Sequence, residues 1–169
     1  MLNRSLVRGG RPYAPTRLED FTLLTGVPAA VNRLREAGFL TIVVTNQPDV
    51  ATGKQSLETL ADMHRLLREW VAVDDIKVCR HTDAELCDCR KPKPGMLVAA
   101  AQEHGIDLVR SYMIGDRWRD IAAGQAAGCM TIFVDHGYDE PRPDSPDAIV
   151  ADLPQATDWI LHREDENAQ

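Results

Sequence analysis

The sequence predicts an α/β fold in which helices cover both faces of a parallel sheet, giving three layers like those of a Rossmann domain. Short apolar runs alternate along the chain with segments of helical periodicity, and this alternation favours parallel strands joined by crossover helices. A chain of 169 residues has the size of one domain. We expect residues 1–162 to form a single domain without a large cap domain, and the polar residues 163–169 to form a disordered tail.

Five apolar segments are expected to form the strands. The clearest is the β-branched run Leu40 to Thr45, which ends in Asn46-Gln47-Pro48 as a buried strand followed by a loop would. The others are residues 76–79, 112–114, 130–134 and 148–150. Ligands of open α/β sheets bind beyond the carboxyl ends of the strands. The first candidates for a site are therefore Thr45, Cys79, Arg80, Asp116 and Asp135.

Five helices are expected between and after these strands, over residues 27–37, 57–71, 94–104, 120–127 and 153–162. Ser56 is a suitable N-cap for the second, which carries an apolar stripe. Gly38, Gly105 and Gly128 follow the first, third and fourth, where glycine commonly ends a helix.

The charge balance excludes several classes of partner. The chain carries 26 acidic and 19 basic residues, a net charge of −7, which argues against nucleic acid or an anionic membrane surface. The net negative charge is still compatible with a small anionic ligand bound in a locally basic pocket. The sequence contains no apolar run near the ~20 residues of a membrane span, and the first twenty residues have no apolar signal segment. We expect a cytoplasmic protein, and nothing in the sequence demands more than a monomer.

Three cysteines and a histidine form the most specific local motif. Cys79, His81, Cys87 and Cys89 follow the spacing C-x-H-x5-C-x-C. Three thiolates and one imidazole complete a tetrahedral set, which predicts a closed structural Zn²⁺ site with no vacancy for a catalytic water. The alternative is a chance grouping of cysteines beside a surface histidine.

A basic loop follows directly. Arg90 and Lys91 open the run R-K-P-K-P-G, which leads into the start of a predicted helix. A helix N-terminus favours anions, and the added cations would make a phosphate pocket. In isolation the run is better explained as a solvated loop, and its position beside the cysteines at the start of a helix is what favours the phosphate pocket.

Two further motifs follow predicted strands. Asp116 and Asp120 are four residues apart at a strand-to-helix junction, where carboxylates can direct oxygens at Mg²⁺ or simply cap the helix. Thr45 and Asn46 could hold a phosphoryl oxygen or close a turn.

Taken in order, these motifs resemble the haloacid dehalogenase-like (HAD-like) superfamily of phosphatases. Thr45 stands at the hydroxyl motif, Lys91 at the lysine motif, and Asp116 with Asp120 at the acidic motif. The combination of V-V-T-N-Q, C-x-H…C-x-C-R-K-P-x-P-G-M and S-Y-M-I-G-D is similar to the D-glycero-D-manno-heptose-1,7-bisphosphate 7-phosphatases and the related histidinol-phosphatase domains. The resemblance spans about Asn3 to Asp152.

The resemblance implies Mg²⁺-dependent hydrolysis of a small phosphorylated sugar through an aspartyl-phosphate. The substrate best matched is D-glycero-D-manno-heptose 1,7-bisphosphate, losing its 7-phosphate, with histidinol phosphate as the alternative. Thr45 would hydrogen-bond to the phosphoryl oxygens and Lys91 would neutralise the transferring group. Asp116 would bind Mg²⁺, with Asp120 nearby. The implied substrate contacts are Asn46, Arg90 and Arg117.

The resemblance breaks at the start of the sequence. The family's first motif, D-x-D-G-T/V-I/L-N, supplies the nucleophile and the general acid–base. Leu2 and Asn3 match its last two positions, so the nucleophile would fall four residues before Met1, and the first acidic residues present are Glu19 and Asp20. We expect either a truncated or misassigned start, with the central first strand missing, or a catalytically inactive, zinc-stabilised phosphosugar-binding relative.

Overall fold

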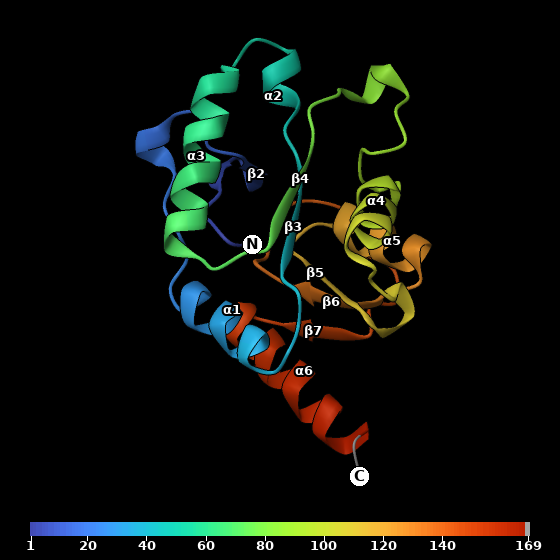
Figure 1. Cartoon of the computed structure of the whole chain (residues 1–169). Coiled ribbons are helices and arrows are strands. Elements are labelled where there is room, and N and C mark those ends of the chain that lie inside the picture. Colours follow the sequence, from blue (N-terminus) through green and yellow to red (C-terminus); the bar gives the residue numbers. More distant parts are fainter. Residues whose placement is uncertain (168–169) are drawn as a thin grey trace.

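A computed structural model describes residues 1–167 and has the predicted three-layer α/β architecture (Figure 1). Strand β3 (Ile42–Asn46) pairs in parallel with β4 (Asp75–Cys79). Strands β5 (Tyr112–Gly115), β6 (Met130–Val134) and β7 (Ala148–Val150) form a second parallel sheet in that order. All five predicted strands are therefore confirmed, with ends that shift by one or two residues.

The helices cover two faces. One core lies under α1 (Val27–Glu36), the C-terminal part of α3 (Leu57–Trp70) and α6 (Leu153–Asn167), and side chains of both sheets pack against it. A smaller core on the other face lies under α4 (Gly95–His104) and α5 (Trp118–Ala127). Because strands of both sheets contribute side chains to both cores, the two sheets form one layer of the fold. Within residues 1–167, β3 and β5 each have a strand partner on one edge only.

Local signals set the helix ends as expected. The Ser56 hydroxyl accepts a hydrogen bond from the Thr59 amide at 3.0 Å and caps α3. Gly105 and Gly128 adopt left-handed conformations after α4 and α5. No helix in the described part of the chain is both long and apolar enough to cross a membrane.

Several short elements of the structure were not predicted from the sequence. A hairpin joins β1 (Leu6–Arg8) to the antiparallel β2 (Arg11–Tyr13) through Gly9-Gly10, whose positive φ angles suit a two-residue turn. A short helix α2 (Pro48–Ala51) follows β3. Single 3-10 turns occur at η1 (Leu18–Asp20), η2 (Asp83–Glu85) and η3 (Leu108–Arg110).

The prediction of a disordered tail is wrong for residues 163–167. Helix α6 continues to Asn167 because side chains in its last turns have partners on the domain. The Tyr112 hydroxyl of β5 donates to Glu164 at 2.5 Å, and within the helix the Arg163 guanidinium lies 5.4 Å from the centre of the Trp159 ring, one turn earlier. Residues 168–169 lie outside the described residues.

Candidate active site

The acidic motif lies at the carboxyl end of β5, as predicted. Asp120 is buried in the first turn of α5, where its Oδ2 accepts a hydrogen bond from the Arg117 amide at 3.0 Å. A Cβ added to Gly115 would lie 2.1 Å from the Cβ of Asp120, so only glycine permits this close approach. The other oxygen, Oδ1, lies 2.6 Å from the Lys91 Nζ. The structure therefore brings Lys91 and Asp120 together.

Lys91 is buried and is anchored to β3. Its Nζ donates to the Val44 carbonyl at 2.7 Å, and the Asn46 amide bonds the Lys91 backbone twice, donating to the carbonyl at 3.0 Å and accepting from the amide at 3.1 Å. Thr45 lies between these two anchors, and its hydroxyl accepts a hydrogen bond from Gln47 at 3.1 Å. Asn46, expected to contact substrate, therefore uses its side chain to place Lys91.

Asp116 is the other carboxylate of the acidic motif. Its side chain is 11% exposed, and its Oδ2 lies 2.8 Å from the Met1 amino nitrogen. Burial opposes ionisation, but the positive charge and hydrogen bond of the Met1 ammonium, with His136 nearby, hold the pKa of Asp116 below its usual value. The beginning of the sequence thus lies against the acidic motif.

The four predicted zinc ligands converge after β4. Their ligand atoms all lie within 4.8 Å of one another. Cys79 Sγ is 3.7 Å from Cys87 Sγ, which is 3.5 Å from Cys89 Sγ. His81 Nδ1 lies 3.6 Å from Cys79 Sγ and 3.3 Å from Cys89 Sγ. Zn–S bonds of about 2.3 Å and a Zn–N bond of about 2.0 Å in a tetrahedron separate ligand atoms by roughly 3.5–3.8 Å. These four distances fit that geometry within a few tenths of an ångström.

Asp83, which the sequence analysis did not single out, joins this cysteine loop to the acidic motif. Its Oδ1 accepts from Arg90 Nε at 2.7 Å and from Arg119 Nη1 at 3.0 Å. Arg90 also donates to the His81 carbonyl at 3.1 Å. Arg90, expected to contact substrate, is thereby held between the loop and α5.

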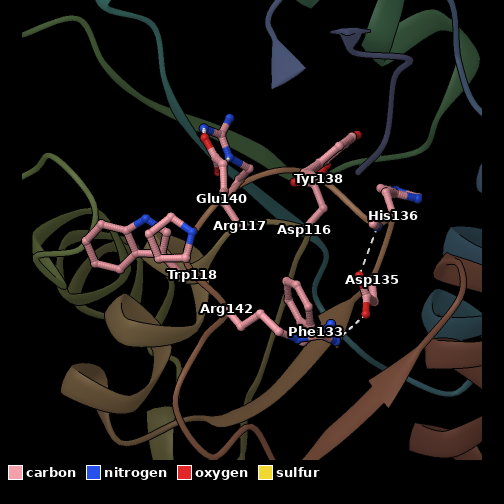
Figure 2. A pocket seen from close by; sticks show the side chains of 11 residues that line it. Asp116, Arg117, Trp118, Phe133, Asp135, His136, Tyr138, Glu140 and Arg142 are labelled. Carbon is pink, nitrogen blue, oxygen red and sulfur yellow. Dashed lines mark hydrogen bonds and ion pairs between the residues drawn. The ribbon is translucent and has the colours of Figure 1, made fainter. Parts of the chain in front are cut away.

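A cavity of about 280 Å³ opens beside Asp116, between α5 and residues 135–142 after β6 (Figure 2). Arg117, the third expected substrate contact, lines it and pairs with Glu140 through two nitrogens. Asp135 was expected near the site because it follows β6, but nothing local in the sequence marks Tyr138 or Glu140. Thr45 and Lys91 do not line this cavity.

This fold and this constellation at the carboxyl ends of its strands define a HAD-like hydrolase, and comparisons with known proteins agree. A family model described as HAD-hydrolase-like matches residues 88–156. A D-glycero-D-manno-heptose-1,7-bisphosphate 7-phosphatase from Thermosynechococcus vestitus is 35% identical over 167 residues, with 85% of each chain covered. The corresponding phosphatase from Pseudomonas putida is 40% identical over 128 residues, with 73% of each chain covered.

Among solved structures, a D,D-heptose 1,7-bisphosphate phosphatase from B. bronchiseptica, complexed with magnesium and phosphate, superimposes with a TM-score of 0.78. It is 29% identical, and the match covers 88% of each chain. The chain belongs to the heptose-bisphosphate phosphatase family of HAD-like hydrolases.

Proposed function

We propose that this protein removes the 7-phosphate of D-glycero-D-manno-heptose 1,7-bisphosphate in a Mg²⁺-dependent reaction. The observation that carries the proposal is the buried Lys91–Asp120 pair beside Asp116, at the carboxyl ends of β3 and β5. Relatives from T. vestitus and P. putida that carry this activity in their names align over most of the chain.

Each side chain has a distinct role in the proposal. The Lys91 ammonium, which Asp120 and the Val44 carbonyl hold in place, neutralises charge on the transferring phosphoryl group. The Thr45 hydroxyl donates to a phosphoryl oxygen. Asn46 and Asp120 keep Lys91 oriented.

The donor set near β5 suits Mg²⁺, which prefers hard carboxylate oxygens. Asp116 is the direct ligand in this proposal, because both oxygens of Asp120 already have partners in the structure. When bound, Mg²⁺ neutralises developing charge and orients the phosphate.

We further propose that Cys79, His81, Cys87 and Cys89 hold a structural Zn²⁺. Four protein ligands leave no position for a reacting water, so the ion would organise the loop only. The Asp83 contacts to Arg90 and Arg119 support this role, since they tie the loop to the catalytic end of the sheet.

The Asp-x-Asp motif that supplies the attacking carboxylate in the family does not occur among residues 1–167. The first acidic residues, Glu19 and Asp20, belong to η1, which packs against α3. Binding of a phosphosugar without hydrolysis is the second candidate function for the 169-residue chain.

A substrate panel separates these possibilities. A strand ending in Asp-x-Asp-Gly-Thr is joined before Leu2, and phosphate release is measured for heptose 1,7-bisphosphate and histidinol phosphate with Mg²⁺. We expect a higher kcat/KM for the heptose bisphosphate, and Asp116→Asn should abolish turnover of both. Preference for histidinol phosphate would transfer the assignment to that reaction. Binding of both esters without any release would support the non-hydrolytic function.

A further inference from the structure

The cavity beside Asp116 has a size and lining that the phosphate-transfer roles above do not use. It lies between the first turn of α5 and residues 135–142 (Figure 2). Its volume of about 280 Å³ is far more than a single water molecule needs and is enough for a small organic group. Because the cavity adjoins the position proposed for the phosphate, the group that fills it would be the leaving group, which is the alcohol released when the phosphate ester is cleaved.

Both cations of the cavity are already paired. Arg117 bonds Glu140 through Nε and Nη2, and Arg142 bonds Asp135. In Figure 2 the first pair lies on one side of the cavity and the second on the opposite side. With Asp116, three carboxylates and two guanidiniums line the space. A second phosphate placed here would therefore meet net negative charge and two guanidiniums already bonded to carboxylates.

Hydroxyl groups are better suited to such a lining. A hydroxyl donates to a carboxylate and accepts from a guanidinium, so it can bind to an ion pair without separating it. Polar groups of this kind combined with apolar surface are typical of small-molecule sites.

Aromatic rings supply the apolar surface. Trp118 and Phe133 line the cavity, and so do His136 and Tyr138, whose ring centres lie 5.4 Å apart. Figure 2 shows Trp118 and Tyr138 on different sides of the space, with Tyr138 close to Asp116. A phenol presents a flat apolar face and one hydroxyl, a combination that can contact both the carbon skeleton and an oxygen of a sugar.

We propose that this cavity binds the polyhydroxylated carbon skeleton of the substrate's leaving group, and that Tyr138 is a specificity-determining residue. The inference rests on the proposed function, because it places the phosphate at Asp116 and Lys91. It assigns any second phosphate of the substrate to a position outside this cavity.

Calorimetric titration of the 169-residue chain with Mg²⁺ tests the proposal, using two probes: inorganic phosphate and D-mannose 6-phosphate. We expect the sugar phosphate to bind more tightly than inorganic phosphate. Tyr138→Phe should lower the affinity for the sugar phosphate about three- to tenfold, which is the effect of losing one hydrogen bond, and should leave the affinity for inorganic phosphate unchanged. Trp118→Leu should have the same selective effect.

Tyr112→Phe is the matched control, because the Tyr112 hydroxyl bonds Glu164 at the start of β5, away from the cavity. It should change neither affinity. Unaltered preference for the sugar phosphate in both Tyr138→Phe and Trp118→Leu would overturn this inference and leave the proposed function standing. Failure of the wild-type chain to bind inorganic phosphate would instead overturn the proposed phosphate site, and the leaving-group subsite with it.

Discussion

Replacing Lys91 with Met should destabilise the protein strongly, because it leaves a buried carboxylate without its partner. The side chains of Lys91 and Asp120 are 10% and 9% exposed, and their charged atoms lie 2.6 Å apart. Removing one member of a buried ion pair typically costs about 3–5 kcal/mol. Since domains of this kind are stable by about 5–15 kcal/mol, the loss would be a large fraction of the free energy of unfolding.

A double-mutant cycle in urea measures this coupling. The single variants are Lys91→Met and Asp120→Asn, and the double variant should recover much of the loss, giving a coupling energy of about 2–3 kcal/mol. The exposed pair Arg33–Asp158, whose side chains are 47% and 62% exposed, is the matched control and should couple by less than about 1 kcal/mol. Equal coupling energies in the two pairs would refute the reasoning, provided that the slope of the free energy of unfolding against urea concentration is the same in all variants.

Two more predictions concern the metal loop and the acid stability. Protein purified without added metal should contain about one Zn²⁺ per chain by elemental analysis. Cys89→Ser should remove the ion, whereas the control Cys129→Ser, which changes a cysteine of the core, should retain it. A wild-type content below roughly a tenth of an equivalent would contradict the zinc site. Hydrogen bonds from Lys77 and His104 hold the pKa of Asp75 well below its value in the unfolded chain. The ionised Asp75 therefore stabilises the folded state fully above about pH 5, and this contribution is lost progressively as the pH falls below about 4. Asp75→Asn should therefore flatten the fall in melting temperature between about pH 5 and 3, and an unchanged slope would show that Asp75 contributes nothing.

The sequence predicted the parts of the site whose signals are local. The four proposed zinc ligands lie within eleven positions, from Cys79 to Cys89, so their spacing could be recognised directly. The strands are runs of β-branched and apolar residues, so the sequence could place Thr45, Asp116 and Asp135 at the carboxyl ends of three strands.

Contacts between distant residues could not be predicted in the same way. Glu140 reaches Arg117 across 23 positions, and Asp83 reaches Arg119 across 36. Each is a single carboxylate in a polar loop, and loops rich in acidic residues are common. The partners of Arg90 and Arg117 became visible only when the fold brought these loops to the ends of the strands.

The two errors in local structure also have physical causes. The strands of the hairpin β1–β2 have three residues each and include arginines, so the usual apolar alternation is too short to detect. The end of α6 is polar because it is mostly exposed, and partners such as Tyr112 stabilise it from outside the helix.

The central claim is that residues of this chain form the phosphate-binding and charge-neutralising part of a phosphatase site next to Asp116. The most direct measurement compares Mg²⁺-dependent release of phosphate from heptose 1,7-bisphosphate by the 169-residue chain and by the same chain joined at Leu2 to a strand ending in Asp-x-Asp-Gly-Thr. The account predicts no turnover by the first, turnover by the second, and none when the first Asp of the joined strand is changed to Asn. Equal phosphate release by the two chains, or release by the joined chain that survives both that change and Lys91→Met, would contradict it.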